Sequence, residues 1–355
     1  MQGAIEDNIR LNQEEFDAAR GTLSSTPEGI GIGAHYRCNG QCVFCLGGKE
    51  DFFSLRRYQE FFEPKLGEAI RHARYVNFCG FGELLFLPEI EEFLSYVNAT
   101  IPQVNKIYTT NGTPLANRAV VRLLTESKSV VEISLHASTA ALHQRITGLR
   151  NFDAIQASIK DLIARRVTYG YPTVSLVFLI HTLNIEDLPD FVTYAASLGV
   201  DEVIANYLTI FKKEHIPFSC FFEQDKTVFS MAEAESRARS LGMAFRMPPR
   251  FQERAGLQEK TRCSDPWKYC YIENEGRVYP CCYAGESVGQ LEDTAFTDIW
   301  NGQGYQELRR SWMEGPVHEW CRYCMRYAKD NVNDLCAHIN ARPGFREEII
   351  RNLSK

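Results

Sequence analysis

The sequence lacks long apolar runs and an excess of positive charge. No stretch approaches the ~20 consecutive apolar residues that a membrane-spanning helix needs. The segment from Met1 to Arg20 is polar and acidic, without the apolar centre of a signal peptide. The net charge is −6, so no general basic field would attract nucleic acid or an anionic membrane surface. We therefore expect a cytoplasmic protein that binds neither nucleic acid nor membrane.

Cysteine, by contrast, is abundant. Twelve cysteines without a secretion signal favour metal chemistry in a reducing compartment over disulfides. Three residues separate Cys38 from Cys42, two separate Cys42 from Cys45, and Phe44 precedes the last. Three thiolates can hold a metal centre that keeps one position without a protein ligand, whereas iron–sulfur clusters normally use four. Structural zinc, the alternative, usually takes four ligands from two paired knuckles.

Short apolar runs alternate with amphipathic segments along the chain. This alternation is typical of βαβ units and a parallel sheet. Six repeats are too few for a closed eight-stranded barrel, so we expect an α/β fold with an open, partial (β/α)6 barrel. Because chemistry gathers at the carboxyl ends of such strands, the cysteine loop after the first strand lies on the functional face. The predicted strands are 31–36, 75–79, 106–110, 130–135, 173–180 and 203–207, and the predicted helices are 13–20, 54–72, 87–98, 115–126, 153–167, 186–198 and 231–241.

The composition changes near residue 246. Pro248-Pro249 and a mixed-charge segment mark a boundary, and seven of the twelve cysteines lie from Cys263 onward. Asn274-Glu275-Gly276 predicts the turn of a β-hairpin over 271–279, and a helix is expected near 295–313. The predicted parts are a lead-in (1–29), the barrel (30–245), a linker (246–262), a small cysteine-rich domain (263–340) and a C-terminal helix (341–355).

The spacing Cys-x3-Cys-x-aromatic-Cys resembles the signature of the radical S-adenosylmethionine (SAM) enzymes. The resemblance implies that Cys38, Cys42 and Cys45 hold a 4Fe–4S cluster whose fourth iron is chelated by SAM. At the end of the second predicted strand, Gly80-Phe81-Gly82-Glu83 resembles the family's Gly-Gly-Glu element, with Phe81 where the family has its middle glycine. The resemblance implies that the backbone of this element and its acid contact the SAM ammonium.

Other strand ends carry polar residues at positions where the family binds SAM. The resemblance implies that Ser134 contacts the ribose and that Arg145 pairs with the SAM carboxylate, which a guanidinium binds through two parallel hydrogen bonds. It also implies adenosyl contacts from Asn206 and Tyr207, although packing explains Tyr207 equally well.

Two further strand ends are less specific. His136 lies where it could face a substrate, but a hydrogen-bonded core histidine is an equal explanation. Asn111-Gly112 matches a Thr-Asn-Gly sequence common in the family, and a turn that requires a positive φ explains it without any function.

A second cysteine pattern begins at Cys263. Twelve residues separate Cys263 from Gly276, four separate Gly276 from Cys281, and a Cys-x2-Cys pair follows. This pattern resembles the SPASM/Twitch extension of radical SAM enzymes. A full SPASM domain continues with two further closely spaced cysteines that 325–335 lacks, so the shorter Twitch form is favoured. The implied ligands of one auxiliary 4Fe–4S cluster are Cys263, Cys281, Cys321 and Cys324.

Three more cysteines keep alternatives open in this domain. Cys270, Cys282 and Cys336 are enough to contribute to a second auxiliary cluster. A zinc ribbon is the alternative for the whole domain, because paired cysteines also suit tetrahedral zinc.

The resemblance implies an enzyme in which one electron, from an external donor of the flavodoxin or ferredoxin type, cleaves SAM to methionine and a 5′-deoxyadenosyl radical. The radical takes a hydrogen atom from a substrate C–H bond. We expect a small-molecule substrate, a hydroxylated sugar or aminocyclitol of natural product biosynthesis. Its oxidation, with the auxiliary cluster accepting an electron, would make the protein a radical SAM oxidoreductase.

Three alternatives stay open. One is redox-neutral epimerisation of a sugar by a hydrogen-donating thiol, for which Cys79 and Cys220 are the catalytic candidates, although a buried structural thiol is commoner. Another is modification of a ribosomal peptide with the same two clusters. The most remote is a non-catalytic iron–sulfur carrier or zinc module, against which the predicted SAM contacts argue.

Cys38→Ala should abolish SAM cleavage, because it removes a predicted ligand of the catalytic cluster. Cys321→Ala should still cleave SAM to 5′-deoxyadenosine but lose the product, because it affects only the auxiliary cluster. Chromatography of 5′-deoxyadenosine and product after anaerobic incubation measures both outcomes. Full turnover by Cys321→Ala would contradict the auxiliary-cluster mechanism.

Overall fold

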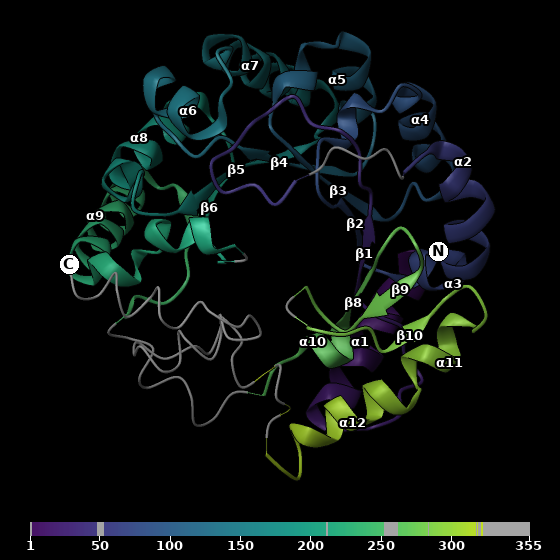
Figure 1. Ribbon diagram of the computed structural model, residues 1–355. Helices are drawn as coiled ribbons and strands as arrows, with labels where there is room; N and C mark the ends of the chain where they lie inside the picture. The colour runs from purple at the N-terminus through teal and green to yellow at the C-terminus, as the bar shows by residue number, and fades with distance from the viewer. Residues whose placement is uncertain are drawn as a thin grey trace.

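One sheet runs through the whole protein. A computed structural model describes residues 2–47, 53–210, 212–251, 262–282, 284–316, 318 and 321. The ten strands of the sheet follow the order β10-β9-β8-β1-β2-β3-β4-β5-β6-β7. They curve around a centre, with helices on the outside (Figure 1). The strands are β1 (Gly29–Gly33), β2 (Tyr75–Cys79), β3 (Asn105–Thr110), β4 (Ser129–Ser134), β5 (Thr173–Ile180), β6 (Glu202–Tyr207), β7 (Ala244–Arg246), β8 (Tyr269–Ile272), β9 (Arg277–Tyr279) and β10 (Gly289–Gln290).

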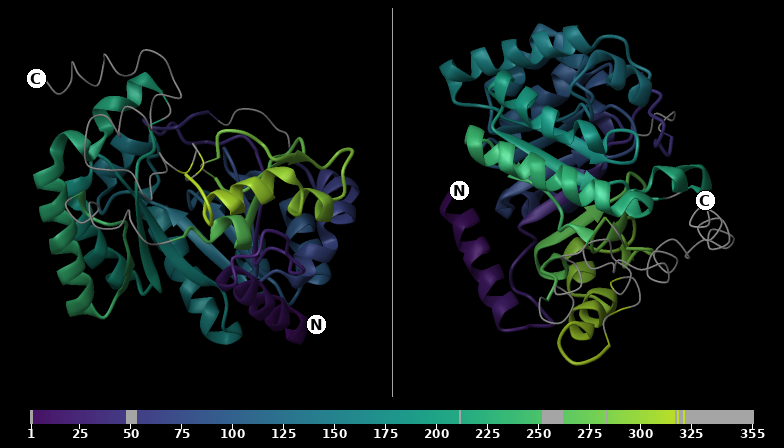
Figure 2. Two further views of the ribbon diagram at one scale, coloured as in Figure 1. Left: turned by 90° about the horizontal axis from the view of Figure 1, so that it is seen from below. Right: turned by 90° about the vertical axis from the view of Figure 1, so that its left-hand side faces the viewer.

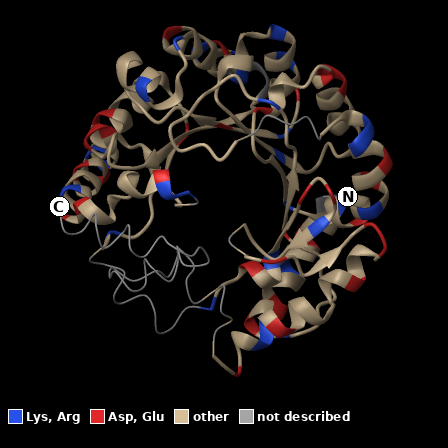
Figure 3. Ribbon diagram, in the orientation of Figure 1, with Lys and Arg blue, Asp and Glu red and all other residues tan. Residues whose placement is uncertain are grey.

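Strands β1 to β7 are parallel, and helices connect them. This confirms the predicted α/β class and the partial barrel. Basic residues and acidic residues are both spread along the outer helices (Figure 3). Among the described helices, none has the length and apolar character to cross a membrane. The longer connecting helices are α3 (Glu63–His72), α4 (Ile90–Thr100), α5 (Arg118–Thr125), α6 (Ala140–Thr147), α7 (Phe152–Tyr169), α8 (Leu188–Leu198) and α9 (Gln224–Leu241).

Alternation along the strands separates an outer apolar face from an inner polar one. In β2, Val76 and Phe78 are buried, and the Phe78 ring meets Phe93 of α4 edge to face at 5.1 Å. Asn77 and Cys79 are only partly buried. Because successive side chains of a strand point to opposite faces, these two residues lie on the inner face of the barrel.

Some predicted helix boundaries are wrong. The first helix, α1, spans Gln2–Asp17 rather than 13–20. Its buried side includes Asn12 and Glu15, so polar residues occupy positions where an apolar stripe would have revealed the helix. The helix predicted over 54–72 has these bounds within one residue, and it consists of α2 (Leu55–Arg57), a π-helical turn η1 (Tyr58–Phe62) and α3.

The cysteine-rich part contains the predicted hairpin, formed by β8 and β9. Its later helical segment is divided into two helices, α11 (Phe296–Trp300) and α12 (Gln303–Ser311), and a short α10 (Asp265–Lys268) precedes β8. The predicted C-terminal helix and most of the predicted linker lie outside the described residues.

The sheet extends further than the six predicted strands. β7 adds to β6, and β8 pairs in parallel with β1, Gly29 to Ile32 lying opposite Tyr269 to Ile272. The cysteine-rich part therefore shares the sheet of the barrel. This pairing joins segments that lie far apart in the sequence, which local periodicity does not predict.

Glycine in β1 makes room for the tyrosines of its neighbours. A Cβ on Gly31 would stand 2.3 Å from the Tyr269 hydroxyl oxygen and 3.0 Å from Cδ2 of Tyr271. A Cβ on Gly29 would stand 2.2 Å from the hydroxyl oxygen of Tyr75 on β2. Tyrosine rings from both flanking strands thus lie across β1, where only hydrogen fits.

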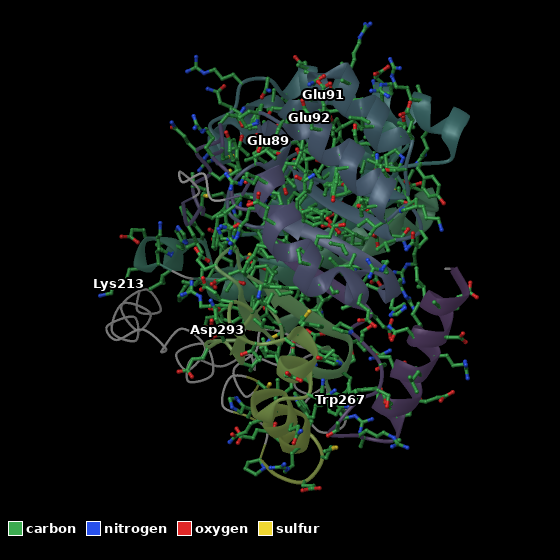
Figure 4. All side chains as sticks on the ribbon, turned by 90° about the vertical axis from the view of Figure 1, so that its right-hand side faces the viewer. Glu89, Glu91, Glu92, Lys213, Trp267 and Asp293 are labelled. Atoms are coloured by element: carbon green, nitrogen blue, oxygen red, sulfur yellow. The ribbon has the colours of Figure 1, made fainter. Side chains whose placement is uncertain are left out.

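The N-terminal lead-in (1–29) packs against the helices of the cysteine-rich part (Figure 2). Asn12 donates from Nδ2 to the Trp267 carbonyl at 2.6 Å, and the Trp267 ring meets Phe16 edge to face at 5.5 Å. Trp267 is labelled in Figure 4. The Trp300 indole donates to the Ser25 carbonyl at 2.9 Å, and Arg309 donates to the Gly21 carbonyl at 2.9 Å. The N-terminal helix therefore supports the cysteine-rich part.

Gly31→Ala should destabilise the protein, because the added methyl group meets the Tyr269 ring; overpacking of this kind typically costs ~1–3 kcal/mol. Thermal unfolding of the variant and of wild type, both anaerobic, measures the effect. Gly3→Ala is the matched control, since a Cβ there has no neighbour within 4 Å. Equal melting temperatures for Gly31→Ala and Gly3→Ala would contradict the close packing of β8 on β1.

Candidate active site

The chain after β1 continues beside the end of β2 and carries the first cysteine. The Ala34 amide donates to the Cys79 carbonyl at 2.7 Å, and the Tyr36 amide donates to the Phe81 carbonyl at 3.3 Å. The Glu83 amide returns a bond to the Tyr36 carbonyl at 3.3 Å. The residues before Cys38 are thus fixed to the same element that was predicted to bind SAM.

The cysteine loop is also fixed to the end of α6. The amide of Gln41 donates to the Thr147 carbonyl at 2.8 Å, and the amide of Val43 donates to the Ile146 carbonyl at 2.9 Å. A third tether comes from Lys212, whose Nζ donates to the Leu46 carbonyl at 3.1 Å. Lys212 follows β6, and sequence reasoning missed it because a surface lysine has no distinctive pattern.

The three thiols fit an iron–sulfur cluster by their chemistry. Cys38 and Cys42 are partly buried and Cys45 is exposed. Burial, with Cys45 and Cys38 nearby, raises the pKa of the Cys42 thiol to about 12, so metal binding must displace its proton. Within the described ranges, no three His, Cys, Asp or Glu side chains form a group suited to one metal ion. A 4Fe–4S cluster is wider than a single ion and needs its thiolates farther apart.

Two glycines at the end of β2 permit a close backbone approach. Gly82 has a φ of +115°, and a Cβ there would lie 1.4 Å from the carbonyl oxygen of Tyr36. A Cβ on Gly80 would lie 2.7 Å from the His35 ring. Phe81 between them is 47% exposed, with its ring edge to face on His35 at 5.3 Å. Phe81, which stands where the family has its middle glycine, therefore lies at a position where a side chain fits.

Glu83 is buried, with 1% of its surface exposed. Its carboxylate accepts hydrogen bonds from the Leu85 amide at 3.2 Å and from the Asn111 amide at 2.6 Å. Burial raises the pKa of Glu83 to about 7, and these hydrogen bonds act in the opposite direction. An ammonium group nearby would stabilise its ionised form, which fits the predicted contact with SAM.

Two buried histidines face Phe44 of the cysteine loop. The rings of His136 and His181 lie 5.3 and 5.5 Å from the Phe44 ring. Backbone amides of Leu179 and Leu183 donate to their Nδ1 atoms, which places the proton of each neutral ring on Nε2. Burial lowers the pKa of His136 to about 3 and that of His181 to about 4.

His136 also has a φ of +61°, a conformation that costs non-glycine residues energy and often marks functional sites. The sequence left two explanations for His136, a residue that faces the substrate or a hydrogen-bonded core histidine. His181 directly follows β5, at a strand end where the resemblance to the family implied polar contacts with the adenosyl group, as it did for Asn206 and Tyr207.

The other four residues predicted to contact SAM differ in how exposed they are. Ser134 ends β4 and is partly buried, and Arg145 is exposed on α6. Asn206 is exposed on β6. The Tyr207 hydroxyl lies 3.2 Å from the Met231 sulfur and 3.3 Å from the Pro249 carbonyl, as expected for packing. The SAM contacts of all four residues stay predictions.

The two candidate thiols differ in their surroundings. Cys79 ends β2 on the inner face, and burial raises the pKa of its thiol to about 12. Cys220 is 3% exposed within the hydrophobic core, and burial likewise raises the pKa of its thiol to about 12. Cys79 lies beside the predicted SAM element, whereas Cys220 fits the structural explanation.

The auxiliary cysteines are only partly described. Cys263, Cys281 and Cys321 are partly buried, and Cys282 is exposed. Cys270, on β8, is fully buried in the hydrophobic core. Cys324 and Cys336 lie outside the described residues, so the auxiliary ligand set stays a prediction.

The fold and this site define a class of enzyme in which a cysteine loop and a SAM site share the carboxyl face of a partial barrel. Two family models match the chain: one described as the radical SAM superfamily, over residues 34–195, and one described as SPASM, an iron–sulfur cluster-binding domain, over residues 263–325. The chain belongs to the radical SAM superfamily and carries a C-terminal SPASM domain. Its cofactors are a 4Fe–4S cluster with SAM and an auxiliary iron–sulfur cluster.

Two curated proteins and a solved structure are similar to this chain. The mycofactocin maturase MftC of Mycobacterium tuberculosis is 27% identical over 304 residues, 82% of this chain and 74% of the relative. The PqqA peptide cyclase of Methylorubrum populi is 25% identical over 213 residues, 56% of this chain and 52% of the relative. The solved structure of Streptococcus suis SuiB bound to precursor peptide SuiA has a TM-score of 0.64 at 15% identity, covering 86% of this chain and 71% of that one. The likeness to SuiB shows a shared fold.

Gly82→Ala should prevent both cluster assembly and SAM binding, because its methyl group overlaps the Tyr36 carbonyl two residues before Cys38. Iron content and the SAM-induced change of the reduced cluster's EPR signal measure the two losses. Phe81→Gly is the matched control, since it removes an exposed ring and should keep both. A Gly82→Ala protein with wild-type iron content and SAM response would refute this role of Gly82.

Proposed function

We propose that this radical SAM enzyme modifies a peptide made by the ribosome. The observation that carries the proposal is the similarity to two proteins. One is MftC, which is named a maturase, and the other is the PqqA peptide cyclase, whose name states that it cyclises a peptide. These relatives favour the peptide alternative over the expected sugar or aminocyclitol. Dehydrogenation and epimerisation of a small molecule have no comparable support among them.

The residues assigned to cofactor binding are those of the predicted site. Cys38, Cys42 and Cys45 would hold the catalytic cluster, and Glu83 would bind the SAM ammonium. When bound, the cluster and SAM would supply a 5′-deoxyadenosyl radical that takes a hydrogen atom from the substrate. The cysteine loop is tied to α6 and to the end of β2, and it would hold the cluster at the carboxyl ends of the strands.

The inner face of the barrel offers polar partners to a substrate. Thr109, Glu132 and Ser175 lie opposite one another on β3, β4 and β5, and Glu202 follows on β6. The Thr109 hydroxyl donates to Glu132 at 3.3 Å, and Arg246 of β7 pairs with Glu202 at 3.2 Å. Burial raises the pKa of Glu132. This row suits the amide groups of a peptide, although a sugar would also find hydrogen bonds there.

Co-expression tests the proposal. The chain is produced with the short peptides encoded next to its gene, and mass spectrometry compares peptides recovered with wild type and with Cys38→Ala. We expect a mass change in one peptide that depends on Cys38, because the variant lacks a cluster ligand. Unchanged peptides, together with conversion of a sugar or aminocyclitol by the wild type, would contradict the proposal.

A further inference from the structure

Asn111, the first residue after β3, contacts two parts of the site. Its side-chain Nδ2 lies 3.6 Å from the Sγ of Cys38 and 2.8 Å from Oδ1 of Asn39. Its backbone amide donates to the Glu83 carboxylate at 2.6 Å. One residue therefore links the cysteine loop to the acid predicted to bind SAM.

Hydrogen bonds determine the orientation of the Asn111 amide. The Thr113 backbone amide lies 2.9 Å from Oδ1 of Asn111, and the Thr113 hydroxyl lies 2.5 Å from the same atom. Because a backbone N–H can only donate, this atom must be the acceptor oxygen. The NH₂ group must then face the loop, where its two hydrogens are directed at Asn39 and at the sulfur of Cys38.

Cys38 receives a second donor from its own loop. The backbone amide of Gly40 lies 3.3 Å from the Cys38 sulfur, within the range of an N–H···S hydrogen bond. Donors to a cluster sulfur stabilise the extra negative charge of the reduced state, and hydrogen bonds to the sulfurs are among the factors that set cluster potentials. Of these two donors, only the one from Asn111 can be removed by changing a side chain.

We propose that Asn111 is a positioning residue that raises the reduction potential of the cluster held at Cys38. It does so through its N–H···S hydrogen bond, while its backbone keeps Glu83 in place. This role goes beyond the turn that the Asn-Gly sequence explains. It rests on Cys38 as a cluster ligand and is independent of the substrate.

A potentiometric titration followed by EPR, without SAM or substrate, tests the proposal. The cluster to follow is the one whose signal changes when SAM is added to a separate sample. Asn111→Leu and Asn111→Ala both remove the donor without adding charge, so the comparison does not depend on a single variant folding. Asn105→Asp and Asn111→Asp form a second pair, because Asn105 begins the same strand at its opposite end.

We expect lower midpoint potentials than wild type for Asn111→Leu and Asn111→Ala, and a larger decrease for Asn111→Asp, which adds negative charge at the sulfur. Asn105→Asp should keep the wild-type potential. Unchanged potentials in both neutral variants would overturn the proposal, even if Asn111→Asp differed, because added charge alone would then explain the shift. A failure to find a peptide substrate would leave this titration unaffected.

Discussion

The parallel pairing of β1 with β8 is the interaction on which the rest of the structure depends. β1 leads into the loop of Cys38, and β8 lies between Cys263 and Cys281. Both cysteine-bearing segments are therefore adjacent in sequence to neighbouring strands of one sheet. Gly31 allows this approach, because the space that a side chain would fill is taken by Tyr269. The two predicted clusters are thus connected through backbone hydrogen bonds rather than through a flexible joint.

A second close approach shapes the carboxyl face. Gly82 brings the end of β2 against the Tyr36 carbonyl, so the cysteine loop and the Gly-Phe-Gly-Glu element form one unit. Asn111 contacts both the Glu83 carboxylate and Cys38 of the loop. The loop predicted to hold the cluster and the acid predicted to bind SAM must keep a fixed distance if an electron is to pass from one cofactor to the other. The hydrogen bonds of Tyr36 and Asn111 hold the cysteine loop and Glu83 in fixed positions relative to each other.

Local chemistry explains what the sequence could predict. The strands of the barrel were predicted because apolar runs alternate with helices, and β2 and β5 have the predicted bounds. The three cysteines and the glycine-rich element were recognisable because their spacing is set by the cofactors. These features are fixed within a few residues of chain, and such short-range constraints can be read directly from a sequence.

The features that were missed depend on distant partners. The first half of α1 was not predicted, because Asn12 on its buried side is a polar residue whose partner is the distant Trp267 carbonyl of the cysteine-rich part. Asn111 was explained as a turn, since its contact with Cys38 joins different loops. The small-molecule expectation had no pattern of its own in the sequence, and the relatives favour a peptide instead.

The central claim is that the cysteine segments next to β1 and β8 each hold an iron–sulfur cluster. The most direct test measures the iron and acid-labile sulfide content of anaerobically reconstituted protein. EPR spectra are recorded after reduction and again after SAM is added. We expect about eight irons per chain and two cluster signals, of which SAM changes one. About four irons, with zinc bound in addition, would contradict it, because the cysteine-rich part would then be a structural zinc module.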